Sequence, residues 1–214
     1  MNRIASKRAG FTLIEILISV TVIGVTLGSV IMSMGQGAAA WQSNMAAGTL
    51  DAKTERTLSR IIRYLESASG DNIQPDLGLT PLSSWIDFQE ITGYGGGAVS
   101  LSETSRIQLE IAPGEIDNGA DDNGNGLIDE CRVVLIRDPG GDETQVVIAN
   151  GIREYLEGET GAVGDENGNG LFDEPGLCFD LEGNTLNIRI TLEKVGPSGR
   201  LLTRTLEGSI TLLN

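Results

Sequence analysis

The chain has 214 residues, which is enough for one domain plus an anchor or for two small domains. A hydrophobic share of 40% can form a core, and an aromatic share of 4% with 29 glycines is typical of a loop-rich β domain. The formal charge of −15 disfavours nucleic acid as a partner, because the phosphates would be repelled. The chain has no histidine, no nucleophile-elbow motif and no phosphate-loop motif, so we expect neither an enzyme nor catalytic residues.

The first ten residues are basic and end in Gly10. They carry Arg3, Lys7 and Arg8, so a chain without them would hold twelve basic and thirty acidic side chains, a formal charge of −18. An apolar stretch follows over residues 11–34, and as a helix it would be about 36 Å long. That length crosses a bilayer core of roughly 30 Å, and the basic residues before it keep the N-terminus in the cytoplasm.

Glu15 is the only charged residue between Gly10 and Asp51. An unpaired carboxylate in mid-bilayer costs roughly 2.5–3.5 kcal/mol, so it requires a partner. A free amine produced by cleavage after Gly10 would provide one, if a neighbouring subunit supplied it. An ordinary membrane anchor leaves Glu15 unexplained. A secretory signal peptide cut near residues 38–40 would have a shorter apolar core, of about 7–15 residues.

The run Gly10-Phe11-Thr12-Leu13-Ile14-Glu15 resembles the signature of type IV prepilins and pseudopilins. The resemblance implies that a prepilin peptidase cuts after Gly10, that the amine of Phe11 is methylated, and that Glu15 directs assembly. It also implies other pilins or pseudopilins and an inner-membrane assembly platform as partners. The protein would then be a single-pass inner-membrane protein with a periplasmic C-terminal domain.

The same resemblance implies an α+β, pilin-like fold in which a long N-terminal helix packs on antiparallel β strands. We expect a cleaved leader over 1–10, a membrane and filament-core helix over 11–34, a helix continuation within 35–70, and a β domain over 71–214. The helix should end near Ser67, because apolar residues recur at helical spacing up to that point. These residues are Leu50, Leu58, Ile61, Ile62 and Leu65. Gly24 and Gly28 either allow close helix packing or are merely tolerated in a membrane helix.

Alternating apolar and polar residues, and two short apolar runs that flank a turn, predict the strands of the β domain. The segments are 85–88, 107–111, 133–136, 146–148, 186–192 and 201–213. Glycine and proline predict turns at 138–141 and 197–199. The order of these elements is similar to that of the J-type minor pseudopilin of type II secretion.

A ten-residue acidic segment occurs twice in the β domain. Residues 121–130 read DDNGNGLIDE, and residues 165–174 read DENGNGLFDE. Oxygen-bearing side chains at alternate positions, followed by a glycine turn, can wrap a hard cation. Surface turns without an ion are the alternative. We expect acidic loops over 117–130 and 165–174, anchored to the core by Ile128 and Phe172.

The repeat resembles the first nine positions of an EF-hand calcium loop. The resemblance implies two possible Ca²⁺ sites, each with one main-chain ligand at a leucine. The first set is Asp121, Asn123, Asn125, Leu127 and Asp129, and the second is Asp165, Asn167, Asn169, Leu171 and Asp173. The twelfth-position glutamate is missing, and four nearby carboxylates would have to compensate: Glu130, Glu174, Asp117 and Asp180. Magnesium is the weaker candidate, since it favours a few carboxylates plus water.

Each acidic loop is followed by a cysteine, Cys131 after the first and Cys178 after the second. Two cysteines in an exported domain predict one disulfide, which the chain-entropy model values at roughly 4 kcal/mol. Two buried free thiols are the alternative.

These features together favour a structural filament subunit. The leading hypothesis is a minor pseudopilin or pilin-like protein of a type II secretion or type IV pilus-like machine, which assembles through its N-terminal helix into a periplasmic filament. The alternative is a singly membrane-anchored calcium-binding adhesion or recognition protein that forms no filament. The register of Gly10, Phe11 and Glu15 favours the first.

Overall fold

The computed structural model describes residues 10–77, 82–95, 97–161, 164–168 and 170–212. Residues 1–9 of the predicted leader and the predicted ligand Asn169 lie outside the described residues. The chain divides into two compact units, one ending at Met45 and one beginning at Ala46.

Helix α1 spans Leu13–Leu65 and runs from the first unit into the second. Every side chain of α1 up to Met45 is exposed, including the apolar ones. By length and composition α1 can cross a membrane. The predicted helix from about Phe11 to Ser67 is confirmed to within two residues at each end.

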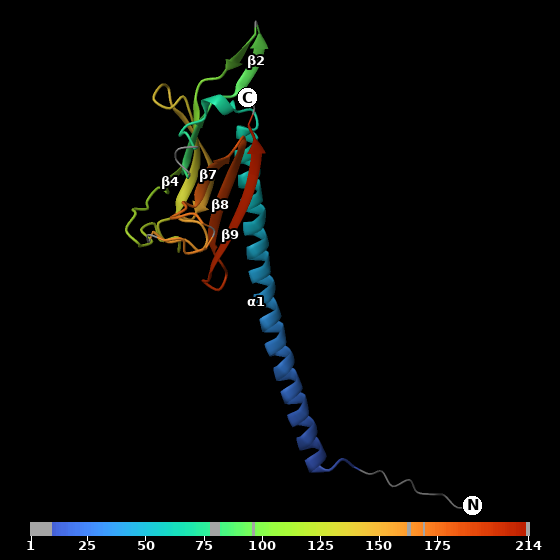
Figure 1. Cartoon of the computed structure of the whole chain (residues 1–214). Helices are drawn as coiled ribbons and strands as arrows, with labels where there is room; N and C mark the ends of the chain where they lie inside the picture. The colour runs from blue at the N-terminus through green and yellow to red at the C-terminus, as the bar shows by residue number, and fades with distance from the viewer. Residues whose placement is uncertain (1–9, 78–81, 96, 162–163, 169, 213–214) are drawn as a thin grey trace, which may run out of the picture. The chain divides into compact units, whose positions relative to one another are not determined.

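The part of α1 in the second unit packs on the sheet through one apolar face (Figure 1). Leu50, Leu58, Ile61 and Leu65 are buried in the core, as their spacing predicts, and Ile62 packs against it from a half-buried position. Burial of this apolar stripe is the main force that holds the helix on the strands.

The sheet of the second unit is antiparallel, with the strand order β1-β4-β5-β6-β8-β7, and β9 pairs with β8. Its strands are β1 (Trp85–Phe88), β4 (Ser105–Ile111), β5 (Cys131–Arg137), β6 (Thr144–Ile152), β7 (Leu177–Glu182), β8 (Thr185–Val195) and β9 (Leu201–Thr211). Alternate residues of β8 point into the core, so Leu186, Ile188 and Ile190 are fully buried. This is the α+β arrangement that the sequence predicts, a long N-terminal helix on antiparallel strands.

Three strands were not predicted. β2 (Ile91–Gly95) and β3 (Ala98–Leu101) form a separate hairpin whose glycines hide the alternation of apolar residues. β7 follows the second acidic loop directly, where turn residues dominate the local sequence. All six predicted strand segments fall within strands, except that β9 ends at Thr211.

The two acidic loops lie in the connections 112–130, between β4 and β5, and 153–176, between β6 and β7. β4 and β6 are both antiparallel to β5, and they therefore run in the same direction. Both connections consequently leave the sheet at the same end, and this topology brings the two acidic loops together.

Candidate functional site

The two acidic loops have closely similar φ angles at equivalent described positions. The φ angle is 92° at both Gly114 and Gly158, and it is 48° at Asp129 and 50° at Asp173. The members of each pair are 44 residues apart, as in the sequence repeat. The structural repeat therefore begins seven residues before the ten-residue sequence repeat.

Glu115 and Glu159 are equivalent carboxylates that the predicted ligand sets did not include. They are 8% and 0% exposed, respectively. Glu115 Oε1 accepts the N–H of Asn123 at 3.0 Å, and Glu159 Oε1 accepts the N–H of Asn167 at 3.1 Å. A Gly-Glu pair that precedes both copies of the repeat by the same distance is the sequence signal that would have revealed them.

Asp121 and Asp165 close their own loops. One oxygen of each accepts the N–H of the glycine five residues later, Gly126 or Gly170, at 2.8 Å in both loops. The other oxygen accepts the N–H of the residue three positions later, at 2.7 Å in both loops. Both carboxylates thus shape the tight turns, because they satisfy main-chain donors that a turn leaves without partners.

The other predicted side-chain ligands of the first loop form hydrogen bonds with groups of the same connection. The side-chain amides of Asn123 and Asn125 donate to Glu130 Oε1 at 2.9 and 2.5 Å. The carboxylate of Asp129 accepts the N–H groups of Asn118 and Gly119 at 3.1 and 2.7 Å. In the second loop, Asn167 donates to Glu174 in the equivalent way. Calcium binding by the two predicted ligand sets stays a prediction.

Leu127, and not Ile128, anchors the first loop. Leu127 is 8% exposed, whereas Ile128 is 57% and Phe172 is 63% exposed. The predicted anchoring by Ile128 and Phe172 is therefore wrong. The positive φ of Gly126 reverses the chain just before Leu127, and this reversal brings Leu127 against β6 near Gly151.

Two clusters of three carboxylates lie in and beside these loops. One consists of Asp117, Asp129 and Glu154, and the other of Glu159, Glu166 and Asp173. Within each cluster, one oxygen from every residue lies within 4.8 Å of the other two. Three carboxylate oxygens at this spacing can coordinate a hard cation.

A cavity of about 490 Å³ lies between the loops, and both clusters contribute to its lining. Asp129 and Glu154 line it from one cluster, and Glu159 lines it from the other. Burial raises the pKa of Glu154, and it also raises the pKa of Glu193 in the same lining, where Arg153 acts in the opposite direction. The cavity is therefore rich in carboxylates held in a partly desolvated environment.

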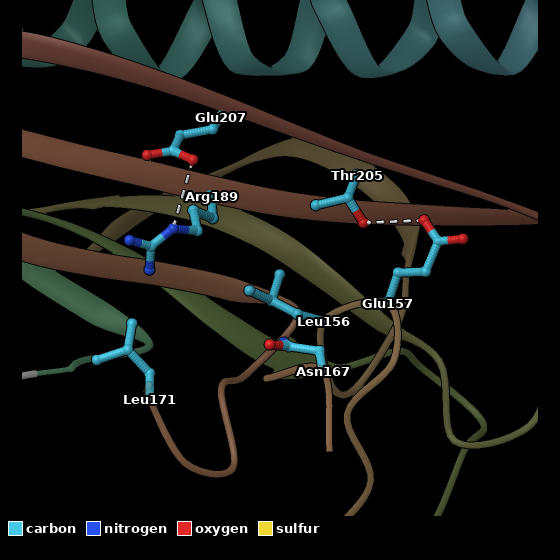
Figure 2. A pocket seen from close by; sticks show the side chains of 7 residues that line it. All are labelled: Leu156, Glu157, Asn167, Leu171, Arg189, Thr205 and Glu207. Atoms are coloured by element: carbon cyan, nitrogen blue, oxygen red, sulfur yellow. Dashed lines mark hydrogen bonds and ion pairs between the residues drawn. The ribbon is translucent and has the colours of Figure 1, made fainter. Parts of the chain in front are cut away.

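A second cavity, of about 410 Å³, lies between the second acidic loop and the strands β8 and β9. Figure 2 shows Asn167 and Leu156 on its loop side, and Arg189 and Glu207 on the strands. Arg189 pairs with Glu207 at 3.7 Å. Arg189 also pairs with Glu174 and Asp180. These contacts tie the second loop to the strands beneath it.

Cys131 and Cys178 are buried free thiols, so the predicted disulfide is wrong. Cys131 belongs to the core cluster, as do the neighbours of Cys178 in β7, Leu177 and Phe179. Because side chains alternate along a strand, Cys178 points to the opposite face of the sheet, where its sulfur accepts from Arg189 at 3.8 Å. β6 and β8 also separate the two strands that carry the cysteines, a distance that no disulfide spans.

The predicted processing residues lie at the start of α1. Gly10 and Phe11 are exposed and precede the helix. Glu15 Oε2 accepts the N–H of Thr12 at 2.8 Å and its hydroxyl at 2.9 Å, and Thr12 Oγ1 accepts the N–H of Glu15 at 3.4 Å. This reciprocal arrangement is a capping box, which sets the first turn of the helix.

Residues 5–31 match the prokaryotic N-terminal methylation motif. The matched range includes Gly10, Phe11 and Glu15, and it extends into the apolar part of α1. Comparison with curated proteins and with solved structures found no match to the chain.

The motif supports the general part of the predicted function, a type IV prepilin-like protein. Such proteins are structural and non-enzymatic, and they assemble with other pilins. The long apolar helix at the motif also supports single-pass membrane anchoring.

Proposed function

We propose that this protein is a minor pseudopilin, a structural subunit that assembles through its N-terminal helix into a periplasmic filament of a type II secretion-like machine. The methylation motif over residues 5–31, which overlaps the start of an exposed apolar helix, is the main support for the proposal. A prepilin peptidase and an inner-membrane assembly platform are the partners that such a subunit needs.

The exposure of the helix supports assembly. Among residues 10–45, every side chain is exposed, and most of those in the first half are large and apolar. Lipid can cover such a surface before assembly, and the helices of neighbouring subunits can cover it afterwards. The same surface therefore suits both a membrane anchor and a filament core.

The first test concerns the processed N-terminus. We expect the mature protein to begin at Phe11 with one methyl group on its amine, and intact-mass analysis with N-terminal sequencing of membrane-extracted protein measures this. An uncut chain that begins at Met1, or a start near Trp41, would contradict the proposal.

A second test separates the proposed assembly role of Glu15 from its capping role. Glu15→Ala should be cleaved normally but should be lost from cross-linked filaments, because the amine of the neighbouring subunit loses its counter-charge. Thr12→Val is the matched control, since it removes the capping hydroxyl and keeps the carboxylate, and it should assemble. Cleavage without any cross-link to itself or to other pilins would instead favour the singly anchored adhesion protein.

A further inference from the structure

Three carboxylates gather in the connection between β6 and β7. Glu159, Glu166 and Asp173 each place one oxygen within 4.8 Å of the other two. Charges of one sign at this distance repel each other, and the repulsion grows as water is excluded. The cluster therefore needs a compensating positive charge.

Two of these residues have a buried oxygen without a hydrogen-bond partner among the described residues. Glu159 is 0% exposed, and its Oε1 accepts the N–H of Asn167, whereas its Oε2 accepts from no group of the described residues. Asp173 Oδ1 is buried and likewise has no partner. Buried polar atoms are normally satisfied, so an oxygen that lacks a donor indicates a ligand that completes the site.

The described side chains do not supply the missing positive charge. None of the ion pairs formed by described residues includes Glu159, Glu166 or Asp173. Arg153 lies beside the loop, but its guanidinium donates to the main-chain oxygens of Leu156 and Glu159, at 3.5 and 3.4 Å. The compensating charge must therefore come from solution.

In the first loop, the glutamate equivalent to Glu159 has no oxygen without a hydrogen-bond partner. Glu115, the equivalent of Glu159, accepts the N–H of Asp122 on one oxygen at 3.4 Å and that of Asn123 on the other at 3.0 Å. Both oxygens of Glu115 are satisfied by the main chain. The unsatisfied oxygen of Glu159 is thus a property of the second loop.

We propose that the second acidic loop binds one divalent cation of the calcium class through Glu159, Glu166 and Asp173. Carboxylate oxygens suit a hard cation, and calcium accepts the irregular geometry of a loop site more readily than magnesium does. Glu166 is exposed, so the ion can enter from solution and keep water ligands on that side. Asp173 was in the predicted ligand set, whereas Glu159 and Glu166 were not. The proposal is independent of the proposed function, and its test needs no filament.

The test measures calcium bound to the full-length protein in detergent, by equilibrium dialysis against radioactive calcium at free concentrations up to about 5 mM, above the Kd range of extracellular calcium modules. Glu159→Gln and Asp173→Asn should each remove one bound ion per chain. The double variant should lose the same single ion, because both residues serve one site.

Glu115→Gln provides the matched background, since it makes the same change at the equivalent position of the first loop. Adding Glu159→Gln to this variant should again remove one ion. If Glu159→Gln leaves the number of bound ions unchanged, in the wild-type or in the Glu115→Gln background, the proposal is overturned.

Thermal unfolding gives a second readout. Calcium at tenfold excess over its Kd should raise the Tm of the wild type by about 3–6 °C, and magnesium at the same concentration should raise it less. Glu159→Gln should abolish the calcium-dependent rise and should raise the Tm in chelator, because it removes a buried charge that lacks a partner. A lower Tm in chelator combined with an unchanged calcium response would contradict the site.

Discussion

Glu15 combines a local role with a proposed intermolecular one. Its Oε2 accepts both donors of Thr12, which closes a capping box at the start of α1. A carboxylate has about four acceptor positions, so these two bonds leave room for the amine of a neighbouring subunit. The cap holds the carboxylate at the start of the helix.

We expect the two cysteine thiols to be unreactive in the folded protein. Burial raises the pKa of both thiols from 9.0 to about 12, so neither forms the reactive thiolate near neutral pH. We expect iodoacetamide at pH 8 to label neither Cys131 nor Cys178 in native protein and to label both after unfolding in guanidinium chloride. Mass spectrometry of the peptides, with Cys131→Ser and Cys178→Ser as site controls, measures this. Equal labelling before and after unfolding would contradict the buried placement.

The same thiols make stability depend on alkaline pH. The folded protein holds each thiol proton more tightly than the unfolded chain does, because the folded pKa is the higher one. Their contribution is therefore fully present below pH 9 and is lost as pH rises from 9 through about 12. Replacement of both cysteines by alanine should therefore reduce the fall in the free energy of unfolding between pH 9 and about 12. The smaller side chains should also lower the free energy of unfolding, but by the same amount at every pH.

At the scale of elements, α1 and β9 pack closely at Gly208. A Cβ atom at this position would lie 2.9 Å from Ile62 Cδ1 and 3.2 Å from Leu58 Cδ2. The helix can approach the strand at this point because Gly208 has no side chain.

We therefore expect Gly208→Val to lower the free energy of unfolding by about 1–3 kcal/mol, as is usual for overpacking. Chemical denaturation measures the change. Ser209→Val is the control, since Ser209 is exposed on the other face of β9 and its replacement should change stability little. A destabilisation at Ser209 as large as that at Gly208 would show that helix packing is not the cause.

At the scale of the whole molecule, the core lies entirely within the second unit. The buried core cluster runs from Leu50 to Leu212, whereas all described residues of the first unit are exposed. The described residues of the first unit thus contribute no buried side chain to the stability of the domain, and they include most of the exposed large apolar side chains.

A chain that begins at Ala46 should therefore fold without the first unit. We expect it to be monomeric in size-exclusion chromatography without detergent and to unfold in one cooperative transition by circular dichroism. The full-length protein, with its apolar helix, should need detergent under the same conditions. A fragment that aggregates or shows no transition would indicate that residues 1–45 are needed for folding.

The sequence by itself determined the features that depend on local pattern. The motif at Gly10, Phe11 and Glu15 is identified by its resemblance to the prepilin signature. The extent of α1, its buried face and six strand segments follow from apolar periodicity, short apolar runs and turn residues, and the structure retains them. The match to the N-terminal methylation motif also supports a prepilin-like N-terminus. Local pattern was sufficient here because the apolar spacing of a helix or strand also decides which face is buried.

Only the tertiary structure decided what the acidic and sulfur-bearing side chains do. The presence of two cysteines in an exported domain predicted a disulfide, but strand order and the alternation of side chains put the two sulfurs on opposite faces of the sheet. Spacing within the repeat also predicted Asp121 and Asp165 as cation ligands, but both accept N–H groups of the turns. It did not predict Glu159, which has a buried oxygen without a partner among the described residues. The partners of a buried polar atom come from chain folded around it, so spacing along the sequence cannot identify them.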